Sequence, residues 1–334
     1  MAALLPSPDL DIATRALIDQ FQRDFPLLNR PFAEIGRQIG LSEAETLRRL
    51  ADLVACGAVT RIGAVVRPHA AGASTLAAVA APADRLEDIA ARINACAGVN
   101  HNYEREHAYN LWFVVTGRTQ DDVERSLADI EQATGLPVLN LPLETSYHID
   151  LGFSLFGARG DKPLARPLTG KADGQDRRVL AAIEAGLPLV EQPFAEVAGR
   201  LGMREADVIH RIDAMVLKGI ISRFGVVVRH RAFGYTANAM AVWDIDDGKV
   251  DEIGARFAAH AGVTLCYRRP RRLPHWRYNL FTMVHGTHRA EAEGTIERLA
   301  EIAAPHLAGR DVLFSLRCFK QRGAVFSATR EDAA

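Results

Sequence analysis

The chain of 334 residues contains an internal repeat, and this repeat constrains the fold more than any other feature of the sequence. Pro31-Phe-Ala-Glu34 recurs as Pro193-Phe-Ala-Glu196, an offset of 162 residues. Without gaps, 15 of the 37 positions in 31–67 are identical to their counterparts in 193–229. Self-similarity at this scale indicates a fused duplication, so each half of the chain is predicted to be one structural module.

Downstream of that segment the two halves keep short matches, separated by small insertions. Tyr103-x-Arg105 corresponds to Tyr267-x-Arg269, and Tyr109-Asn110 corresponds to Tyr278-Asn279. Between the halves, 156–176 is rich in glycine and proline and predicts a flexible linker. The predicted domains are 1–70, 71–155, a linker at 156–175, then 176–232 and 233–330.

Each half predicts the same order of elements. The apolar spacing predicts helices over 12–24, 32–39 and 43–56 and a strand over 59–66, which together form a helix-turn-helix with a wing. Ser42 with Glu45 three residues later is a capping-box pattern for the third helix. The following segment predicts the order βαββαβ, with strands over 75–82, 98–117 (two) and 137–143 and helices over 86–96 and 120–134. We therefore predict an α+β fold, a tandem duplication of a winged helix-turn-helix and a ferredoxin-like domain.

Composition and charge narrow the function. The formal net charge of −1 argues against a chain whose main partner is a polyanion. The four cysteines show neither a C-x-x-C pair nor zinc-ligand spacing, which favours a reducing compartment. The N-terminal segment lacks the features of a signal peptide, and no apolar run approaches the roughly 18 residues of a membrane span. We expect a cytoplasmic protein without a metal site or a membrane partner.

A helix-turn-helix joined to a βαββαβ domain resembles the Lrp/AsnC family of transcriptional regulators, over nearly the whole chain and twice. The resemblance implies that the second domain binds small ligands and drives assembly. It implies an intramolecular pseudo-dimer and leaves a homodimer of chains open. Because a fold does not fix a function, the site residues must decide whether this chain is also a regulator.

The charges of the helix-turn-helix segments argue against specific DNA binding. A DNA-binding domain needs cations to neutralise phosphates and polar side chains at the front of its recognition helix. Residues 11–67 carry eight arginines and seven acids, and 176–229 carry eight basic residues and seven acids. The predicted recognition helices begin with carboxylates, which would repel phosphate: Glu43 and Glu45 in the first copy, Glu205 and Asp207 in the second.

The predicted hairpin of each α+β domain has an unusual composition for strands, which normally carry β-branched and apolar residues. Imidazole, guanidinium and aromatic groups alternate instead, and five arginines lie between 268 and 277 without one acid among them. Such a cluster is costly unless an anion occupies it, and the pattern suits a flat ligand with carboxylates on its rim. The candidate residues are His101, Tyr103, Arg105, His107, Tyr109, Asn110 and Trp112 in the first hairpin, and Arg268, Arg269, His275, Trp276 and Asn279 in the second.

Structural interpretations of the same residues stay open at this point. An arginine-rich hairpin is also typical of a solvated face or a polar subunit contact. The matched Tyr109-Asn110 and Tyr278-Asn279 pairs favour packing over chemistry, because both copies share them. His101 and His107 lack the spacing of a standard metal pair, although they could approach one another across a tight hairpin.

The hairpin motifs carry a closer resemblance. The segments that carry it are HNYEREHAYNLWF and the later TSYHIDLGF strand in the first copy, and CYRR and HWRYNLF in the second. With these segments the chain resembles the two subunit types of siroheme decarboxylases, in the form where both are fused. The resemblance implies removal of two acetate carboxyl groups of siroheme to give 12,18-didecarboxysiroheme, without an added cofactor, in haem d1 or alternative haem biosynthesis. His148 aligns with Lys320 in the last strand, and the role of either is open.

We expect His101, His107 and His275 to act as proton donors or iron-facing groups, because histidine has a pKa of about 6.5. Arg105, Arg268 and Arg269 would hold the retained carboxylates, and Tyr103, Trp112 and Trp276 would pack on the macrocycle. Tyr109, Asn110 and Asn279 are counted with the substrate-binding residues. Two alternatives remain: a DNA-binding regulator that senses a tetrapyrrole, and an interaction scaffold without chemistry.

Overall fold

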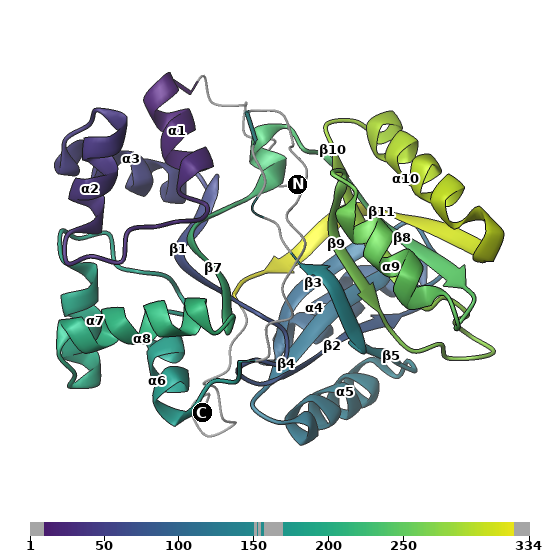
Figure 1. The fold of residues 1–334 in the computed structure, drawn as a ribbon. Coiled ribbons are helices and arrows are strands. Elements are labelled where there is room, and N and C mark those ends of the chain that lie inside the picture. The colour runs from purple at the N-terminus through teal and green to yellow at the C-terminus, as the bar shows by residue number, and fades with distance from the viewer. Residues whose placement is uncertain (1–9, 150–151, 153–154, 157–169, 324–334) are drawn as a thin grey trace. The chain divides into compact units, whose positions relative to one another are not determined.

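The structure, a computed structural model, describes residues 10–149, 152, 155–156 and 170–323. The chain divides into two compact units, the first holding the described residues up to Ala71, then Gly152, Leu155 and Phe156, and those from Gly170 to Gly234. The second unit holds Gly72 to Ile149 and Tyr235 to Gly323. The two helix-turn-helix segments thus share one unit and the two α+β segments share the other (Figure 1). Most of the predicted linker lies outside the described residues.

The first unit contains two copies of three helices and a strand, as predicted. The bounds are α1 Ile12–Gln20, α2 Pro31–Ile39, α3 Glu43–Ala55 and β1 Val59–Val66 in the first copy, and α6 Gly174–Ala182, α7 Pro193–Leu201, α8 Glu205–Leu217 and β7 Ile221–Val228 in the second. A short 3-10 helix, His230–Phe233, follows β7.

The third helix of the first copy begins where the sequence predicts. The Ser42 hydroxyl accepts a hydrogen bond from the Glu45 N–H (3.2 Å), which is the N-cap interaction. The other half of the predicted capping box does not form, because the Glu45 carboxylate binds Arg48 and Arg49 instead. Thr46, Leu50 and Leu53 form its buried stripe.

The strands β1 and β7 join the two copies of this unit as an antiparallel pair. Gly63 lies opposite Gly225 at the middle of the pairing. A Cβ atom at Gly225 would collide with the carbonyl oxygens of Phe21 and Gln22, so the close approach of the chain after α1 requires glycine there. The wing strands therefore serve as the contact between the two copies.

The second unit is built on a nine-stranded sheet of order β5-β2-β4-β3-β11-β8-β10-β9-β6. In the first copy the elements are β2 Ala73–Val79, α4 Leu86–Ala95, β3 Val99–Arg105, β4 Leu111–Gly117, α5 Gln120–Thr134, β5 Leu139–Pro142 and β6 Thr145–Ile149, with a 3-10 turn at Ala83–Arg85. In the second they are β8 Ala237–Ile245, α9 Val250–Ala259, β9 Val263–Arg268, β10 Leu280–Gly286, α10 Arg289–Ala303 and β11 Leu307–Gln321, with a 3-10 turn at Ala304–His306.

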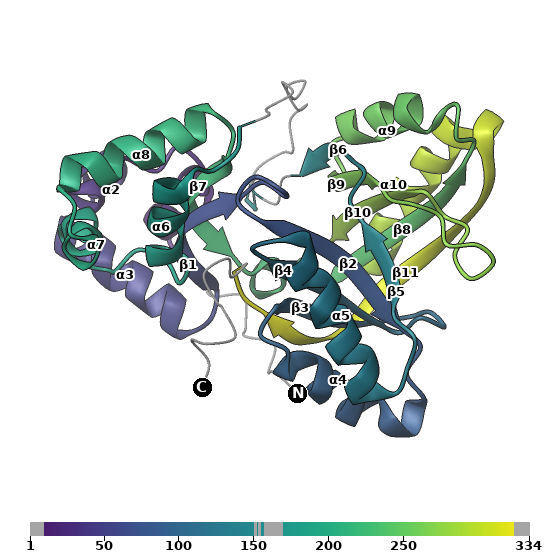
Figure 2. The same ribbon diagram turned by 90° about the horizontal axis from the view of Figure 1, so that it is seen from below.

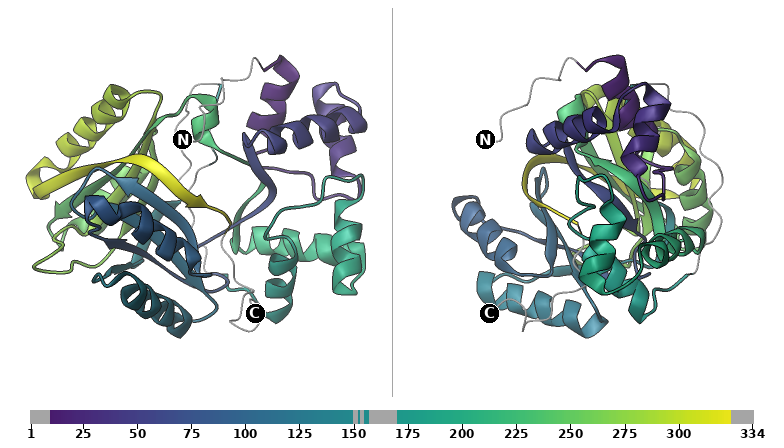
Figure 3. Two further views of the ribbon diagram at one scale, coloured as in Figure 1. Left: turned by 180° about the vertical axis from the view of Figure 1, so that it is seen from behind. Right: turned by 90° about the vertical axis from the view of Figure 1, so that its left-hand side faces the viewer.

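The two α+β copies exchange their last strands, which the βαββαβ prediction did not include. β6 of the first copy pairs with β9 of the second, and the end of β11 pairs with β3 of the first. Tyr147 on β6 packs on the core beneath α9 and α10, while Phe319 on β11 packs on the core beneath α4 and α5. Figure 3 shows β11 as the long yellow strand that spans both halves of the sheet.

The helices cover one face of the sheet in each copy. In Figure 2 the strands lie between the pair α4 and α5 and the pair α9 and α10. A core of Leu86, Ile89, Phe113 and their neighbours forms under the first helix pair, and Trp243, Phe257 and their neighbours form the second. Among the described residues, none of the helices has both the length and the apolar character that a membrane crossing needs.

Candidate functional site

The faces of the sheet that the helices leave uncovered meet in a third core, which we call the inner face. Its buried members are Ala78, Trp112, Leu139, Leu141, Met240, Val242, Trp276, Phe281, Met283 and Leu313, and Tyr109, Leu265, Tyr267 and Tyr278 pack against it. These residues come from both copies. Most of the predicted site residues lie on this inner face or at its margin.

Strand alternation places three predicted residues of β3 on the inner face. Asn102 points to the helix side, where its amide donates to Ala90 O and Asn94 Oδ1 of α4. His101, Tyr103 and Arg105 therefore face the opposite way. Tyr103 lies between the other two, with its ring 6.1 Å from the His101 ring and 5.8 Å from the Arg105 guanidinium.

His101 and His107 do not approach one another across the hairpin, contrary to the possibility raised by the sequence. His101 is paired with Val114 on β4 and Gln321 on β11, and its Nε2 lies 3.1 Å from the Arg322 carbonyl oxygen. His107 lies beyond the end of β3, in the hairpin turn. At roughly 3.3 Å per residue, the extended strand between them separates the two rings.

His107 is held at the end of the hairpin by contacts to both copies. Its Nδ1 accepts a hydrogen bond from the Tyr109 N–H (2.9 Å), and its Nε2 lies 3.5 Å from the Asp311 carboxylate on β11. Its ring lies edge-on to Trp276, with centroids 5.5 Å apart. Burial lowers the pKa of His107 below its ordinary 6.5, and the Asp311 carboxylate opposes this shift.

Arg105 and Arg269 occupy equivalent positions and make equivalent contacts. Arg105 donates to the Leu313 carbonyl oxygen (3.0 Å), and Arg269 donates to the Leu141 carbonyl oxygen, so each arginine reaches into the opposite copy. The Arg269 guanidinium lies 4.8 Å from the Tyr267 ring centroid. Both side chains are buried. They tie the two copies together through the inner face.

Arg269 fits an anionic ligand better than any other residue of its hairpin. Burial lowers its pKa to about 10, and within the described residues no carboxylate pairs with it. Its Nε–H also finds no acceptor in the part of the chain that the structure describes. A buried donor without an acceptor is rare in proteins and marks a position where an oxygen of a ligand would be stabilised.

Three of the five arginines between 268 and 277 are already paired with carboxylates, so most of the cluster does not need a bound anion, which corrects the argument from the sequence. The acids come from other segments that lie near it only in the folded chain. Arg268 pairs with Glu144 (3.0 Å) and Asp251 (3.5 Å) on the helix side of β9, away from Arg269. Arg271 and Arg277 both pair with Asp244, and Arg272 donates to the Asn140 carbonyl oxygen (2.9 Å).

Three of the predicted aromatic residues, Tyr109, Trp112 and Trp276, form a closed cluster rather than an open platform. Trp112 and Trp276 pack against one another with centroids 5.2 Å apart, and their exposed fractions are 2% and 1%. Tyr109 lies 6.1 Å from Trp276, and Tyr278 lies 5.0 Å from it. Both tryptophans are therefore core residues in this structure, because the inner faces of the two copies bury them against each other.

Asn110 and Asn279 have a structural role that accounts for their presence in both copies. The Asn110 amide donates to the Ala81 carbonyl oxygen (2.8 Å) and accepts from the Ala81 N–H (2.8 Å). The Asn279 amide makes the same pair of bonds with Ile245, at 2.8 and 3.1 Å. Each side chain joins the hairpin to the end of the neighbouring strand, so the packing interpretation is sufficient to explain both.

His275 is exposed in the turn between Arg269 and Asn279, so the structure does not bring it to the inner face. Asp311 lies next to the predicted site residue His107, and the sequence did not single it out, because it lies about 200 positions from His107 and carries no local motif. His285 is buried on β10, with its Nδ1 2.9 Å from the Thr264 hydroxyl. His148 lies on β6, opposite Cys266.

Comparisons with known proteins agree with these features. The model of the AsnC-like ligand-binding domain matches 71–148 and 232–320. The model of the siroheme decarboxylase NirDL-like helix-turn-helix domain matches 14–59 and 176–221. The siroheme decarboxylase NirDL subunit of Paracoccus pantotrophus is 47% identical over 96% of this chain and 98% of its own length.

The chain belongs to the siroheme decarboxylase family. The siroheme decarboxylase of Hydrogenobacter thermophilus is 32% identical over 90% of both chains. Among solved structures, the crystal structure of the siroheme decarboxylase NirDL matches with a TM-score of 0.67 and 28% identity, covering 95% of this chain and 94% of that one. A second crystal structure of NirDL, in complex with an iron-uroporphyrin III analogue, matches with a TM-score of 0.66.

Proposed function

We propose that this chain is a siroheme decarboxylase that converts siroheme to 12,18-didecarboxysiroheme by removing two acetate carboxyl groups. The observation that carries the proposal is the 47% identity to the Paracoccus pantotrophus NirDL subunit along nearly the whole of both chains. The inner face supplies chemistry of the required kind. Arg269 is a buried cation without a carboxylate partner among the described residues, His101 lies within β3, and His107 lies just beyond the end of that strand.

The proposed reaction breaks the bond between the methylene carbon of an acetate arm and its carboxyl carbon. Carbon dioxide leaves, the electron pair stays on the methylene carbon and spreads into the macrocycle, and a proton from an imidazolium then gives the methyl group. His101 and His107 are the proposed proton donors of the first copy, because an imidazole titrates near neutral pH. Solvent would return the proton to the ring before the second arm reacts.

The arginines have a separate proposed role. Arg105 and Arg269 would bind carboxylates of the substrate that are not removed, since a guanidinium forms paired hydrogen bonds with a carboxylate. Arg268 is less suited, because it already pairs with Glu144 and Asp251 on the other side of β9. The iron enters with the substrate, and we propose that no added organic cofactor takes part.

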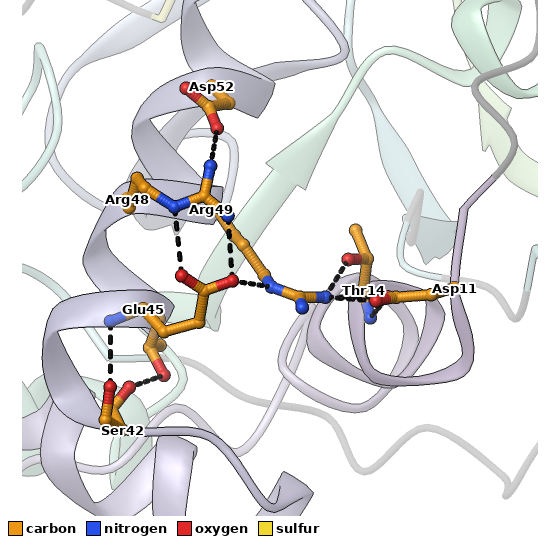
Figure 4. A network of polar contacts seen from close by, with 8 residues as sticks. Asp11, Thr14, Ser42, Glu45, Arg48, Arg49 and Asp52 are labelled. Atoms are coloured by element: carbon orange, nitrogen blue, oxygen red, sulfur yellow. Dashed lines mark hydrogen bonds and ion pairs between the residues drawn. The ribbon is translucent and has the colours of Figure 1, made fainter.

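We further infer that the helix-turn-helix segments serve assembly rather than DNA recognition. Figure 4 shows the arginines of α3 engaged by carboxylates of the same unit. Arg48 pairs with Glu45 and Asp52, both at 2.7 Å, and Arg49 pairs with Asp11 and Glu45, both at 2.7 Å. Cations neutralised in this way would have to break ion pairs before they could bind phosphate.

The second recognition helix, α8, is also in contact with a segment of the first copy. Leu27, Leu28 and Asn29 of the first copy form a groove with the outer face of α8, at Ala206, Ile209, His210 and Asp213. The Asn29 amide donates to the Glu205 carboxylate at the start of that helix (2.7 Å). A recognition helix whose leading end holds another segment of its own chain is poorly placed to enter a major groove.

The decisive experiment is anaerobic incubation of the purified chain with siroheme, followed by mass spectrometry of the tetrapyrrole. We expect a product that has lost two molecules of carbon dioxide. Siroheme that remains bound and unchanged would contradict the proposal and favour the tetrapyrrole-sensing regulator, which a gel-shift assay at physiological salt would then test. Loss of a single carboxyl group would contradict the proposed conversion to the doubly decarboxylated product.

The setting of the reaction follows from the same proposal. We infer a place in haem d1 or alternative haem biosynthesis, and the fused arrangement of the chain favours the former. A cytoplasmic location is inferred from the sequence, and none of the four cysteines is disulfide-bonded. Size-exclusion chromatography with light scattering would show whether the intramolecular pseudo-dimer also forms a dimer of chains.

A further inference from the structure

His107 and Asp311 form a polar pair whose two members come from different copies. His107 lies in the hairpin of the first α+β copy, and Asp311 lies on β11 of the second. Asp311 has the same strand parity as Leu313, whose side chain is part of the inner core, so its carboxylate also faces the inner side. The His107 side chain is mostly buried at 16% exposure, and that of Asp311 is 43% exposed.

The equivalent pair on the other side of the pseudo-dimer is Trp276 and Leu139. When Tyr109-Asn110 is aligned with Tyr278-Asn279, His107 is equivalent to Trp276. Arg105 contacts Leu313 in the same way as Arg269 contacts Leu141, so Asp311 is equivalent to Leu139. Leu139 and Trp276 are both buried members of the inner core. Both positions therefore differ between the two sides of the pseudo-dimer: one side has an imidazole and a carboxylate, and the other has two apolar side chains.

We propose that Asp311 is the positioning residue of His107, so that this acid–base pair needs both copies to form and has no counterpart at Trp276 and Leu139. The Tyr109 N–H donates to Nδ1, so the neutral ring carries its proton on Nε2, the nitrogen that faces Asp311. The carboxylate orients this edge of the ring and stabilises its protonated form, as a third group does for the base in other acid–base pairs. The consequence for turnover rests on the proposed function.

Other charged and titratable groups around His107 are accounted for in the same structure. Tyr109 stacks on its ring (centroids 6.1 Å apart), and Tyr278 adjoins the same cluster through Trp276. Burial is the main cause that raises the pKa of Tyr278. The Asp311 and Asp244 carboxylates raise it further, and the Arg277 guanidinium opposes them. Glu106 precedes His107 but binds Arg289 at 2.9 Å. Asp311 is the carboxylate that acts on His107 in the described chain.

The test is the pKa of His107, measured by NMR on the full chain with isotope-labelled histidine and assigned with a His107→Gln variant. Asp311→Asn removes the charge with little change of shape and is expected to lower this pKa by about half a unit to one unit. Asp311→Leu, which installs the apolar side chain of the equivalent position, Leu139 in the first copy, is expected to lower it at least as much. Glu106→Gln removes the same charge one residue from His107 and is the matched control, expected to leave the pKa unchanged.

An unchanged pKa in both Asp311 variants, or an equal shift in the control, would overturn the proposal. This readout does not depend on activity, so it stands apart from any failure of the chain to decarboxylate siroheme. If the chain is active and His107 donates the proton, the rate falls as the pH rises through its pKa. The alkaline limb of the pH–rate profile should then move to lower pH in Asp311→Asn by the same amount as the NMR pKa.

Discussion

The two hairpins of the α+β unit share their architecture and differ in their polar chemistry. Arg105 and Arg269 make the same contact across the inner face, and Asn110 and Asn279 make the same double hydrogen bond to a neighbouring strand. At the position of His107, however, the second hairpin has Trp276 in the core. In a duplicated chain, residues kept in both copies hold the pseudo-dimer together, and those changed in one copy point to the site.

The largest expected effect is on the decarboxylation rate, and it should separate the histidines of the first hairpin from the histidine of the second. We predict that His107→Ala and His101→Ala each reduce single-turnover decarboxylation of siroheme by about 10²–10⁴-fold, the usual contribution of a positioned general acid. His275→Ala, in the exposed turn of the second hairpin, should change the rate little. The measurement is anaerobic single turnover with mass spectrometry of the product.

Siroheme binding, followed by its absorption spectrum, is the control for the histidine variants. If His101→Ala and His107→Ala bind substrate and retain full turnover, the proton-donor assignment is wrong. If His275→Ala instead abolishes turnover, the second hairpin carries the chemistry, as its predicted role would require.

A second effect of similar free energy concerns stability rather than chemistry. Trp276→Ala should lower the free energy of unfolding by about 3–5 kcal/mol, because it removes a fully buried aromatic side chain from the centre of the inner core. His275→Ala, one residue away and exposed, should change it by less than about 0.5 kcal/mol. Urea unfolding followed by circular dichroism measures both. Equal values for the two variants would show that Trp276 does not act as a core residue.

The sequence predicted the elements well because their signals are local. Ser42 and Glu45 marked the start of α3, and the repeat itself predicted that every element would occur twice. The exchange of β6 and β11 between copies was not predicted, since strand partners far apart in the chain leave no local signal. The same reason explains why Asp311 was missed and why the acids that pair with three arginines of the cluster, such as Asp244, were not anticipated.

A smaller effect on stability is expected from the two asparagines that both hairpins share. Asn110→Ala and Asn279→Ala should each lower the free energy of unfolding by about 1–3 kcal/mol, because each removes a side-chain amide that binds both a backbone N–H and a backbone C=O. The two costs should be similar, since the two amides make the same pair of backbone hydrogen bonds and differ only by the bond from Asn279 to Asp247. A variant that keeps its stability but loses siroheme binding would favour the substrate-binding role predicted from the sequence over the structural one.

The smallest effect is a pH dependence that only the first hairpin should show. Burial lowers the pKa of His107 in the folded chain below its ordinary 6.5, so below that pH the unfolded chain binds more protons at this position. His107 should therefore make the free energy of unfolding fall as the pH drops through about 6.5 and toward the lower folded pKa. His107→Gln should flatten this part of the stability–pH curve, measured by urea unfolding between neutral and mildly acidic pH. Trp276 cannot titrate, so the equivalent position of the second hairpin has no such term. If His107→Gln leaves the slope of the curve unchanged, His107 is not desolvated in the folded chain, and the contrast between a polar and an apolar side of the pseudo-dimer fails at its central residue.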